Sequence, residues 1–162
     1  MLYKKLRMEN FQYKKLYSLC LVHTETDVLL GMKKRGFGEG LWNGFGGKVE
    51  EGESVEDAAK RELLEESGIR AVEIKKMGVN TFEFVGDPKL LEVHIFSVKK
   101  FTGEPTESEE MRPQWFKKHE IPYHAMWVDD LIWLPKLFEG NRFAGAFTFK
   151  DKNIIKHSLK IL

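Results

Sequence analysis

Three glutamates at helical spacing are the residues of this sequence best placed to do chemistry. Glu62, Glu65 and Glu66 stand at positions i, i+3 and i+4 of a segment that we expect to be helical, from Val55 to Ser67. With 100° of rotation per residue, the three glutamates lie on the same face of the helix as the apolar residues at the start of the segment. Helices usually turn such a face into the core, and carboxylates this close repel one another by several tenths of a kcal/mol per pair. The cluster therefore needs a compensating positive charge.

A bound divalent cation would supply that charge. Carboxylates at helical spacing offer hard oxygen ligands to Mg²⁺, which keeps several waters and shares its shell with substrate phosphates. The alternative is a solvated acidic helix face, which is the usual situation of a glutamate-rich helix. The residue types and their spacing leave both interpretations open.

The ends of this helix are clear in the sequence. Ser54 followed three residues later by Asp57 predicts a capping box, and Gly68 can take the left-handed conformation that ends a helix. Segments 16–22 and 28–32 predict a β-hairpin, and the glycine-rich segment 36–47 predicts a shaped loop. Further strands are expected at 72–85, 90–101, 111–116, 143–149 and 154–161, and a helix interrupted by Pro135 at 125–138. The fold class is α+β, a mixed sheet with helices packed on its faces.

Composition limits the number of domains, the kind of partner and the localisation that we expect. With 162 residues and a net charge of +1, the chain fits one domain without an overall field for a nucleic-acid polymer. We expect a basic, mobile extension at residues 1–15 and a single domain at 16–162. Cys20 is the only cysteine, and no apolar run is long enough for a membrane span. We therefore expect a soluble cytoplasmic monomer, with mitochondrial and nuclear fractions as an option left open by the basic extension.

The spacing of charged residues around the helix is more specific than the acids themselves. Gly47, Glu53, the run Arg61-Glu62-Leu63, the pair Glu65-Glu66 and the pair Gly68-Ile69 are separated by five, seven, one and one residues. This pattern resembles the complete Nudix box, with every defined position matched. The resemblance implies the α/β/α sandwich of the Nudix hydrolase family and metal-assisted hydrolysis of a nucleoside diphosphate linked to another group.

The same resemblance implies residue roles. The metal ligands are expected to be Gly46 through its carbonyl, Glu62, Glu65, Glu66 and Glu110. The catalytic set is expected to be Glu53, Arg61, Glu62, Glu65 and Glu66. Mg²⁺ is the expected cofactor, with Mn²⁺ as a substitute, and Arg61 is expected to orient the acids.

Four more segments, 31–38, 42–49, 82–86 and 110–113, resemble the Nudix hydrolases that act on oxidised purine nucleoside triphosphates. The likeness implies hydrolysis of such nucleotides, and by extension of methylated ones, to monophosphate and pyrophosphate, which cleans the nucleotide pool and prevents misincorporation into DNA. The residues expected to bind substrate are Ser18, Lys33, Phe37, Asn43, Phe45, Gly46, Gly47, Lys48, Phe82, Phe84, Trp127, Val128, Asp129 and Asp130.

The residue types suit a purine pocket. Aromatic rings offer flat surfaces for stacking, worth about 1–3 kcal/mol per base, although some of them are expected to be core. Asn43 carries both a donor and an acceptor. If Asp129 and Asp130 face one pocket, repulsion and desolvation raise the pKa of at least one, so that one acid donates a hydrogen bond while the other accepts. Exchange of that proton would serve both 8-oxoguanine and 2-hydroxyadenine.

Other functions remain as alternatives. A Nudix pyrophosphatase could instead act on diadenosine polyphosphates, ADP-ribose or a capped RNA end. A nucleotide-binding module without catalysis is disfavoured by the intact glutamate set, and a purely structural protein is disfavoured because acids on the apolar stripe of a helix are costly without a ligand.

Overall fold

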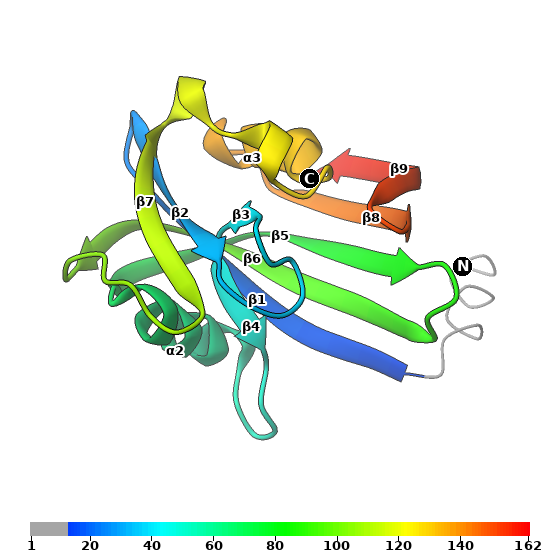
Figure 1. Ribbon diagram of the computed structural model, residues 1–162, viewed down its shortest axis with the longest axis horizontal. Coiled ribbons are helices and arrows are strands. Elements are labelled where there is room, and N and C mark those ends of the chain that lie inside the picture. The colour runs from blue at the N-terminus through cyan, green and yellow to red at the C-terminus, as the bar shows by residue number, and fades with distance from the viewer. Residues whose placement is uncertain (1–12) are drawn as a thin grey trace.

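A mixed β-sheet forms the middle layer of the protein. The structure is a computed structural model and describes residues 13–162. The strands are β1 Tyr13–His23, β2 Asp27–Lys33, β3 Trp42–Asn43, β4 Phe45–Lys48, β5 Arg70–Phe84, β6 Lys89–Thr102, β7 Met111–Lys117, β8 Phe143–Lys150 and β9 Asn153–Ile161. They follow the order β3-β2-β1-β6-β5-β8-β9, with β4 on β1 and β7 on β2 (Figure 1). The pairs β1–β6 and β5–β8 are parallel and the others are antiparallel.

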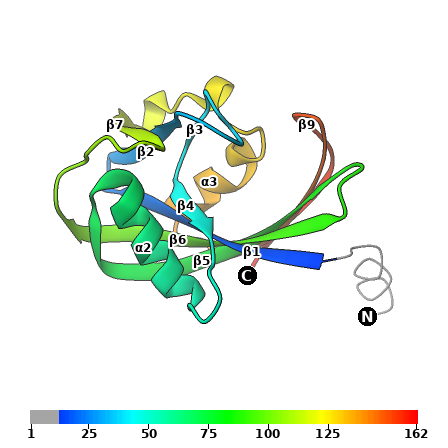
Figure 2. The ribbon, with the colours of Figure 1, turned by 60° about the horizontal axis from the view of Figure 1, so that its bottom comes forward.

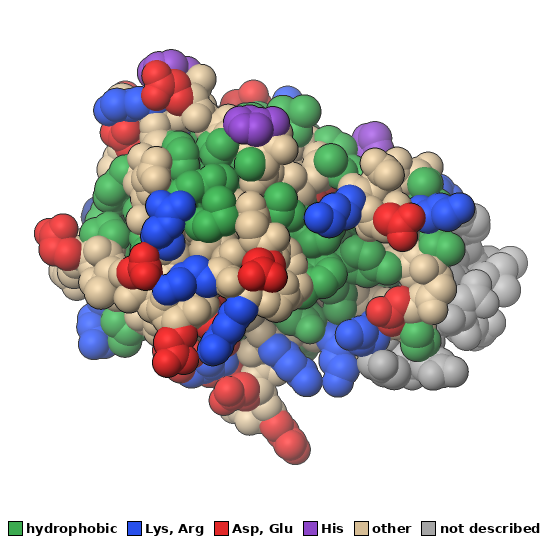
Figure 3. All heavy atoms as spheres, in the orientation of Figure 1, with side chains coloured by type: hydrophobic (Ala, Val, Ile, Leu, Met, Phe, Trp, Pro, Cys, Tyr) green, Lys and Arg blue, Asp and Glu red, His purple; other side chains and the backbone are tan. Residues whose placement is uncertain are grey.

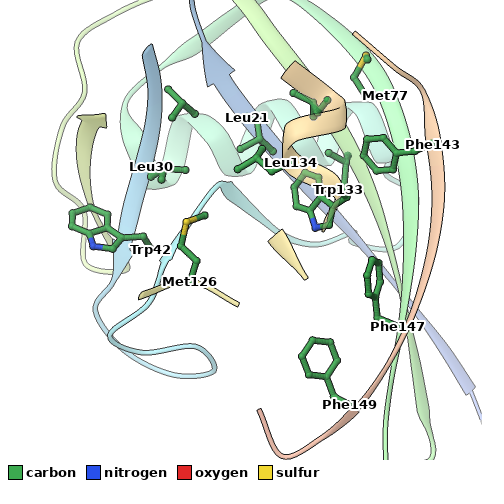
Figure 4. Packing of buried hydrophobic residues seen from close by; sticks show 13 residues of the cluster. Leu21, Leu30, Trp42, Met77, Met126, Trp133, Leu134, Phe143, Phe147 and Phe149 are labelled. Carbon is green, nitrogen blue, oxygen red and sulfur yellow. The ribbon is translucent and has the colours of Figure 1, made fainter. Parts of the chain in front are cut away.

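The two α-helices lie on opposite faces of this sheet. Helix α2 (Val55–Ser67) packs under β1 and β4, and α3 (Asp130–Phe138) covers the other face (Figures 1 and 2). Alternation along β1 separates two cores, because Cys20 and Val22 join the cluster under α2 while Leu21 joins the cluster under α3. Figure 4 shows the α3 cluster, which reaches from Trp42 to the aromatic rings of β8. The expected α/β/α sandwich with a mixed sheet is confirmed.

Most of the predicted elements are confirmed, and the exceptions have physical reasons. The extension predicted at residues 1–15 is too long, because β1 begins at Tyr13 and residues 14 and 15 pair with β6. The rest of that extension lies outside the described residues. The helix predicted at 125–138 begins only at Asp130, since Tyr123–Ala125 is a short 3-10 turn and Met126 is extended. No helix of the described part is long and apolar enough to cross a membrane.

The glycine-rich segment contains two short strands, β3 and β4, where only a loop was predicted. In β4, Gly46 pairs with Leu19 of β1, and a Cβ on Gly46 would overlap the carbonyl oxygen of Ser18. This close approach of two backbones requires glycine. Glycines that indicate a loop in sequence therefore allow a strand here, and that strand forms one wall of the site.

Candidate active site

The geometry of α2 places the glutamates beside β4. The Ser54 hydroxyl accepts a hydrogen bond from the backbone N–H of Asp57 at 3.0 Å, which confirms the predicted N-cap. Gly68 ends the helix with φ 77°, and its N–H donates to the carbonyl of Leu64. These two caps fix where the helix begins and ends. Its second half lies against β4, where Glu66 accepts the N–H of Gly46 and Glu62 lies against Gly47.

Glu66 is a carboxylate held in the interior. Its side chain is 5% exposed, and Oε1 accepts a hydrogen bond of 2.8 Å from the backbone N–H of Gly46. Burial raises the pKa of Glu66 to about 7, against the lowering effect of this hydrogen bond; the nearby carboxylates of Glu62 and Glu110 raise it further. The charged form of Glu66 therefore needs a further positive partner.

Arg61 gathers the other acids of the box. Its Nε and Nη2 donate to the two oxygens of Glu53, at 2.7 and 3.0 Å, and its Nη1 donates to Glu62 at 2.9 Å and to Glu65 at 3.3 Å. The guanidinium hydrogen bonds lower the pKa of Glu53 to about 2. Arg61 thus orients three carboxylates at once, as the Nudix resemblance implies.

The expected metal ligands come only partly together. Among residues 13–162, no three Asp, Glu, His or Cys side chains converge closely enough to form a ready-made metal site. Glu110 is held away by Lys33 at 3.2 Å and by Arg35 at 2.8 Å, and Glu65 is more than half exposed. In this arrangement each carboxylate oxygen of Glu110 is thus paired with a basic side chain.

The inner pair, Glu62 and Glu66, fits a cation well. Burial raises the pKa of Glu62, as it does for Glu66, and for Glu62 it outweighs the hydrogen bond that Arg61 donates. Carboxylate oxygens and the adjacent Gly46 carbonyl are the hard ligands that a divalent cation prefers. These residues suit a divalent metal at the contact between α2 and β4.

Gly47 allows Glu62 to approach β4. A Cβ on this residue would lie 2.7 Å from the carboxyl carbon of Glu62, which is the far end of a flexible side chain. We therefore expect Gly47→Ala to fold with little change in melting temperature but to lower kcat/KM by about 10- to 100-fold, because the carboxylate must move away. Steady-state kinetics with thermal unfolding measure both effects. Gly52→Ala is the comparison: its Cβ meets no neighbouring atom but its φ of 80° is left-handed, so it should lower the melting temperature and leave kcat/KM unchanged. Unchanged kcat/KM in Gly47→Ala would contradict the assigned position of Glu62.

A cavity of about 780 Å³ opens beside this cluster, on the face of the sheet that α3 covers. Its aromatic wall includes Phe37, which stacks on Trp127 with ring centroids 5.0 Å apart, and Phe84, whose ring meets Phe37 edge-on at 5.8 Å. Hydrophobic side chains are exposed between charged ones on the face of the molecule shown in the space-filling view (Figure 3). The size and apolar lining of the cavity suit a ligand as large as a nucleotide.

Two adjacent acids stand in the wall of the same cavity. Asp129 and Asp130 are each 4% exposed, and the indole N–H of Trp133 donates to Asp129 Oδ2 at 2.8 Å. In the described residues, Oδ2 of Asp130 is buried without a hydrogen-bond partner. Burial raises the pKa of both acids, and the neighbouring charge of Asp129 raises that of Asp130 further. The pair is therefore set to share one proton.

The cavity brings together most of the residues predicted to bind substrate. Those on its wall are Ser18, Lys33, Phe37, Asn43, Gly46, Gly47, Phe82, Phe84, Trp127, Asp129 and Asp130, together with Glu66. The prediction for Phe45 is wrong, because Phe45 pairs with Cys20 and shares its direction, into the fully buried core under α2. Val128 is 45% exposed and outside the cavity wall, and Lys48 lines a neighbouring groove instead.

Several wall residues escaped the sequence analysis. Tyr17 and Leu19 on β1, and Leu91 and Val93 on β6, also line the cavity. Each pair is two residues apart in a strand and so lies on one side of it, but Tyr17 and Leu19 lie on the side of β1 opposite to Ser18, so alternation from Ser18 could not predict them. They supply the apolar floor of the cavity.

Comparison with known proteins defines the class to which this fold and site belong. The NUDIX domain profile matches residues 15–137, which is most of the chain. The protein belongs to the Nudix family of hydrolases, whose members generally need a divalent metal.

Within the family, the chain is similar to named enzymes. It is 56% identical over 147 residues to the oxidized purine nucleoside triphosphate hydrolase of Mus musculus and 53% identical over 146 residues to that of Danio rerio. Each alignment covers 90% of this chain and 94% of the relative. Among solved structures, the mutator MutT protein of Bacillus halodurans superposes with a TM-score of 0.81 at 27% identity, covering 90% of this chain and 97% of that one.

Proposed function

We propose that this protein hydrolyses oxidised purine nucleoside triphosphates to the monophosphate and pyrophosphate, with Mg²⁺ as its metal and Mn²⁺ as a substitute. One observation carries the proposal: Glu66 and the pair Asp129–Asp130 lie on the wall of a single cavity. A purine that contacts the two aspartates can therefore extend its phosphates to the glutamates. The similarity to oxidized purine nucleoside triphosphate hydrolases over 90% of the chain supports the same substrate class.

The phosphate end of the site prepares the chemistry. Glu62 and Glu66, with the Gly46 carbonyl, would hold the divalent metal, which neutralises charge on the phosphates and lowers the pKa of water. Arg61 fixes Glu62 and Glu65 in place. An acid of this cluster would accept the proton from the attacking water. Lys33, on the cavity wall, gives a positive contact for the phosphate chain.

The base end selects the nucleotide. Trp127 and Phe37 offer faces for stacking, and Asn43 lies on the same wall with both donor and acceptor. Asp130, when protonated, donates a hydrogen bond to a base edge, and the ionised Asp129 accepts one. Exchange of the proton between the two acids reverses these roles, so that 8-oxoguanine and 2-hydroxyadenine both find a matching pattern. Purines methylated at the O6 or N6 position are further substrates in this proposal.

The consequence for the cell is a cleaner nucleotide pool. Hydrolysis before polymerisation prevents the incorporation of damaged purines into DNA. We propose that the enzyme acts as a cytoplasmic monomer on free nucleotides, with mitochondrial and nuclear fractions, and without a nucleic-acid polymer or membrane as partner. The balance of 26 basic against 25 acidic residues supports the choice of a small substrate over a polyanion.

A substrate panel tests the proposal against other activities of Nudix hydrolases. Initial rates with Mg²⁺ are measured in parallel for 8-oxo-dGTP, 2-hydroxy-dATP, O6-methyl-dGTP, ADP-ribose, diadenosine tetraphosphate and capped RNA, and products are separated by ion-exchange chromatography. We expect the modified purine triphosphates to have the highest kcat/KM and to yield monophosphate plus pyrophosphate. Higher kcat/KM for ADP-ribose, the dinucleotide or capped RNA would assign the enzyme to that substrate instead.

A further inference from the structure

Two buried aspartates carry the negative charge at the base end of the cavity. Within residues 13–162, no lysine, arginine or histidine forms an ion pair with Asp129 or Asp130. Lys33, on the wall of the same cavity, pairs with Glu110 instead, at 3.2 Å. The donor that contacts Asp129 is neutral, because it is the indole N–H of Trp133, at 2.8 Å. The described residues therefore leave the negative charge of the pair for a ligand to balance.

Burial makes this charge costly. Asp129 and Asp130 are each 4% exposed, and Oδ2 of Asp130 has no hydrogen-bond partner among the described residues. Burial raises the pKa of both acids, so the pair keeps one shared proton and one negative charge near neutral pH. Burial and the charge of Asp130 also raise the pKa of Tyr123, in the short turn before α3. A buried negative charge without a counterion is destabilising, and a ligand that brings a positive charge removes that cost.

Aromatic faces beside the acids suit a flat cation. The backbone N–H of Asp130 donates to the carbonyl of Trp127 at 3.1 Å, so a tight turn joins the indole to the acid pair. Phe37 stacks on Trp127 with ring centroids 5.0 Å apart, and Phe84 meets Phe37 edge-on. Because Phe37 is 68% exposed, little packing holds it on the indole, and a purine ring can take its place. Cations bind over aromatic faces, most strongly over that of tryptophan.

A purine alkylated on a ring nitrogen combines a flat ring with a positive charge. Methylation at N1 of adenine or at N7 of guanine leaves the charge spread over the ring, whereas methylation at O6 or N6 leaves the base neutral. Such a base can stack on Trp127 while its charge lies beside the carboxylates. The cavity, at about 780 Å³, also has room for the extra methyl group.

We propose that the base end of the cavity also binds cationic purines, so that purine nucleoside triphosphates alkylated on a ring nitrogen, such as 1-methyl-dATP, are a further substrate class. The inference rests on the proposed function, because it uses the same phosphate end and the same hydrolysis to monophosphate and pyrophosphate. Recognition has a different basis, however. Oxidised purines and purines methylated at O6 or N6 are neutral and are selected by their donors and acceptors, whereas the cationic base is selected by its charge. The cation takes over from the shared proton as the positive partner of the two carboxylates.

Two isomeric monophosphates separate charge from size. 1-Methyl-AMP is cationic at neutral pH and N6-methyl-AMP is neutral, although they differ only in the position of one methyl group. Their dissociation constants are measured by calorimetry in EDTA for the wild type, for Asp129→Asn/Asp130→Asn and for Asp57→Asn, an exposed acid of α2 that serves as the control. We expect the preference for 1-methyl-AMP, the ratio of the two constants, to fall by about 10- to 100-fold in the double variant, because the cation alone loses a buried charge pair. The control should keep the wild-type ratio.

Proton release by the wild type gives a second measurement that needs no variant. Calorimetry in two buffers of different ionisation enthalpy counts the protons released on binding. 1-Methyl-AMP should release the proton shared by the two aspartates, and N6-methyl-AMP should release none. Turnover with Mg²⁺ then tests the substrate class, and we expect kcat/KM for 1-methyl-dATP to exceed that for dATP by about 10-fold or more.

The proposed function and the inference fail in different ways. If the wild type does not hydrolyse 8-oxo-dGTP, the proposed function is wrong and the inference that rests on it is wrong too. If 8-oxo-dGTP is hydrolysed but 1-methyl-dATP reacts no faster than dATP, the inference alone is overturned. A double variant that keeps the wild-type ratio of dissociation constants, or binding of 1-methyl-AMP without proton release, would also overturn it, because charge would then not select the base.

Discussion

Replacement of Glu66 by Gln is expected to lower kcat by about 1000-fold while the enzyme stays folded and still binds nucleotide. Gln has the same size, and its carboxamide oxygen can accept the hydrogen bond from the Gly46 N–H that Glu66 accepts now. It cannot take up a proton from water or contribute negative charge to a metal site. A positioned general base contributes about 100- to 10,000-fold to a rate, and metal ligation adds to this.

The measurement combines kinetics, calorimetry and thermal unfolding. Glu56→Gln is the matched control, because Glu56 is an exposed acid of the same helix that pairs with Lys60 at 3.3 Å. The control should keep wild-type kcat. Glu66→Gln should keep the affinity for 8-oxo-dGMP and a melting temperature at least as high as that of the wild type, since a buried charge is removed. A variant with more than a tenth of wild-type kcat would remove Glu66 from the catalytic set.

Asp130→Asn is expected to change the relative kcat/KM for different oxidised purines and, at the same time, to stabilise the fold. Asn offers a donor and an acceptor but cannot exchange a proton with Asp129. We therefore expect the ratio of kcat/KM for 8-oxo-dGTP to that for 2-hydroxy-dATP to change by about 10-fold or more, and to change in the opposite direction in Asp129→Asn. If both substrates lose the same factor in each variant, proton exchange does not explain the breadth of substrates.

The stability effect follows from the direction of the pKa shift. Burial and the charge of Asp129 raise the pKa of Asp130 in the folded protein, so the folded state binds more protons than the unfolded chain above about pH 4. Wild-type stability must fall as the pH rises through that window, and Asp130→Asn avoids this loss. Urea unfolding should show the variant gaining more than about 1 kcal/mol over the wild type between pH 5 and pH 8. The exposed Asp57→Asn is the control, and a difference that does not depend on pH would contradict a raised pKa.

The catalytic helix could be predicted closely because its signals are local. Ser54 and Gly68 mark the two ends of the helix in the sequence, and the spacing of the acids indicates that they lie on one face of it. Strand alternation is equally local, so the hairpin strands were found with small errors at their ends. The α/β/α arrangement itself depended on the Nudix resemblance.

The cavity could not be derived fully because it depends on long-range pairing. Phe45 lies between residues that reach the cavity, yet its pairing with Cys20 sends it to the opposite core. Helix α3 begins after the extended Met126, and no capping pattern in the sequence predicts this start.

The most direct test of the central claim is kcat/KM for 8-oxo-dGTP and for dGTP, measured side by side with purified protein and Mg²⁺. The two nucleotides differ only at the purine edge, so their phosphates present the same chemistry to the glutamates. A site that recognises the oxidised base should favour 8-oxo-dGTP by about 10- to 100-fold and release 8-oxo-dGMP and pyrophosphate. An equal or higher kcat/KM for dGTP would contradict the assignment as a hydrolase of oxidised purine nucleotides.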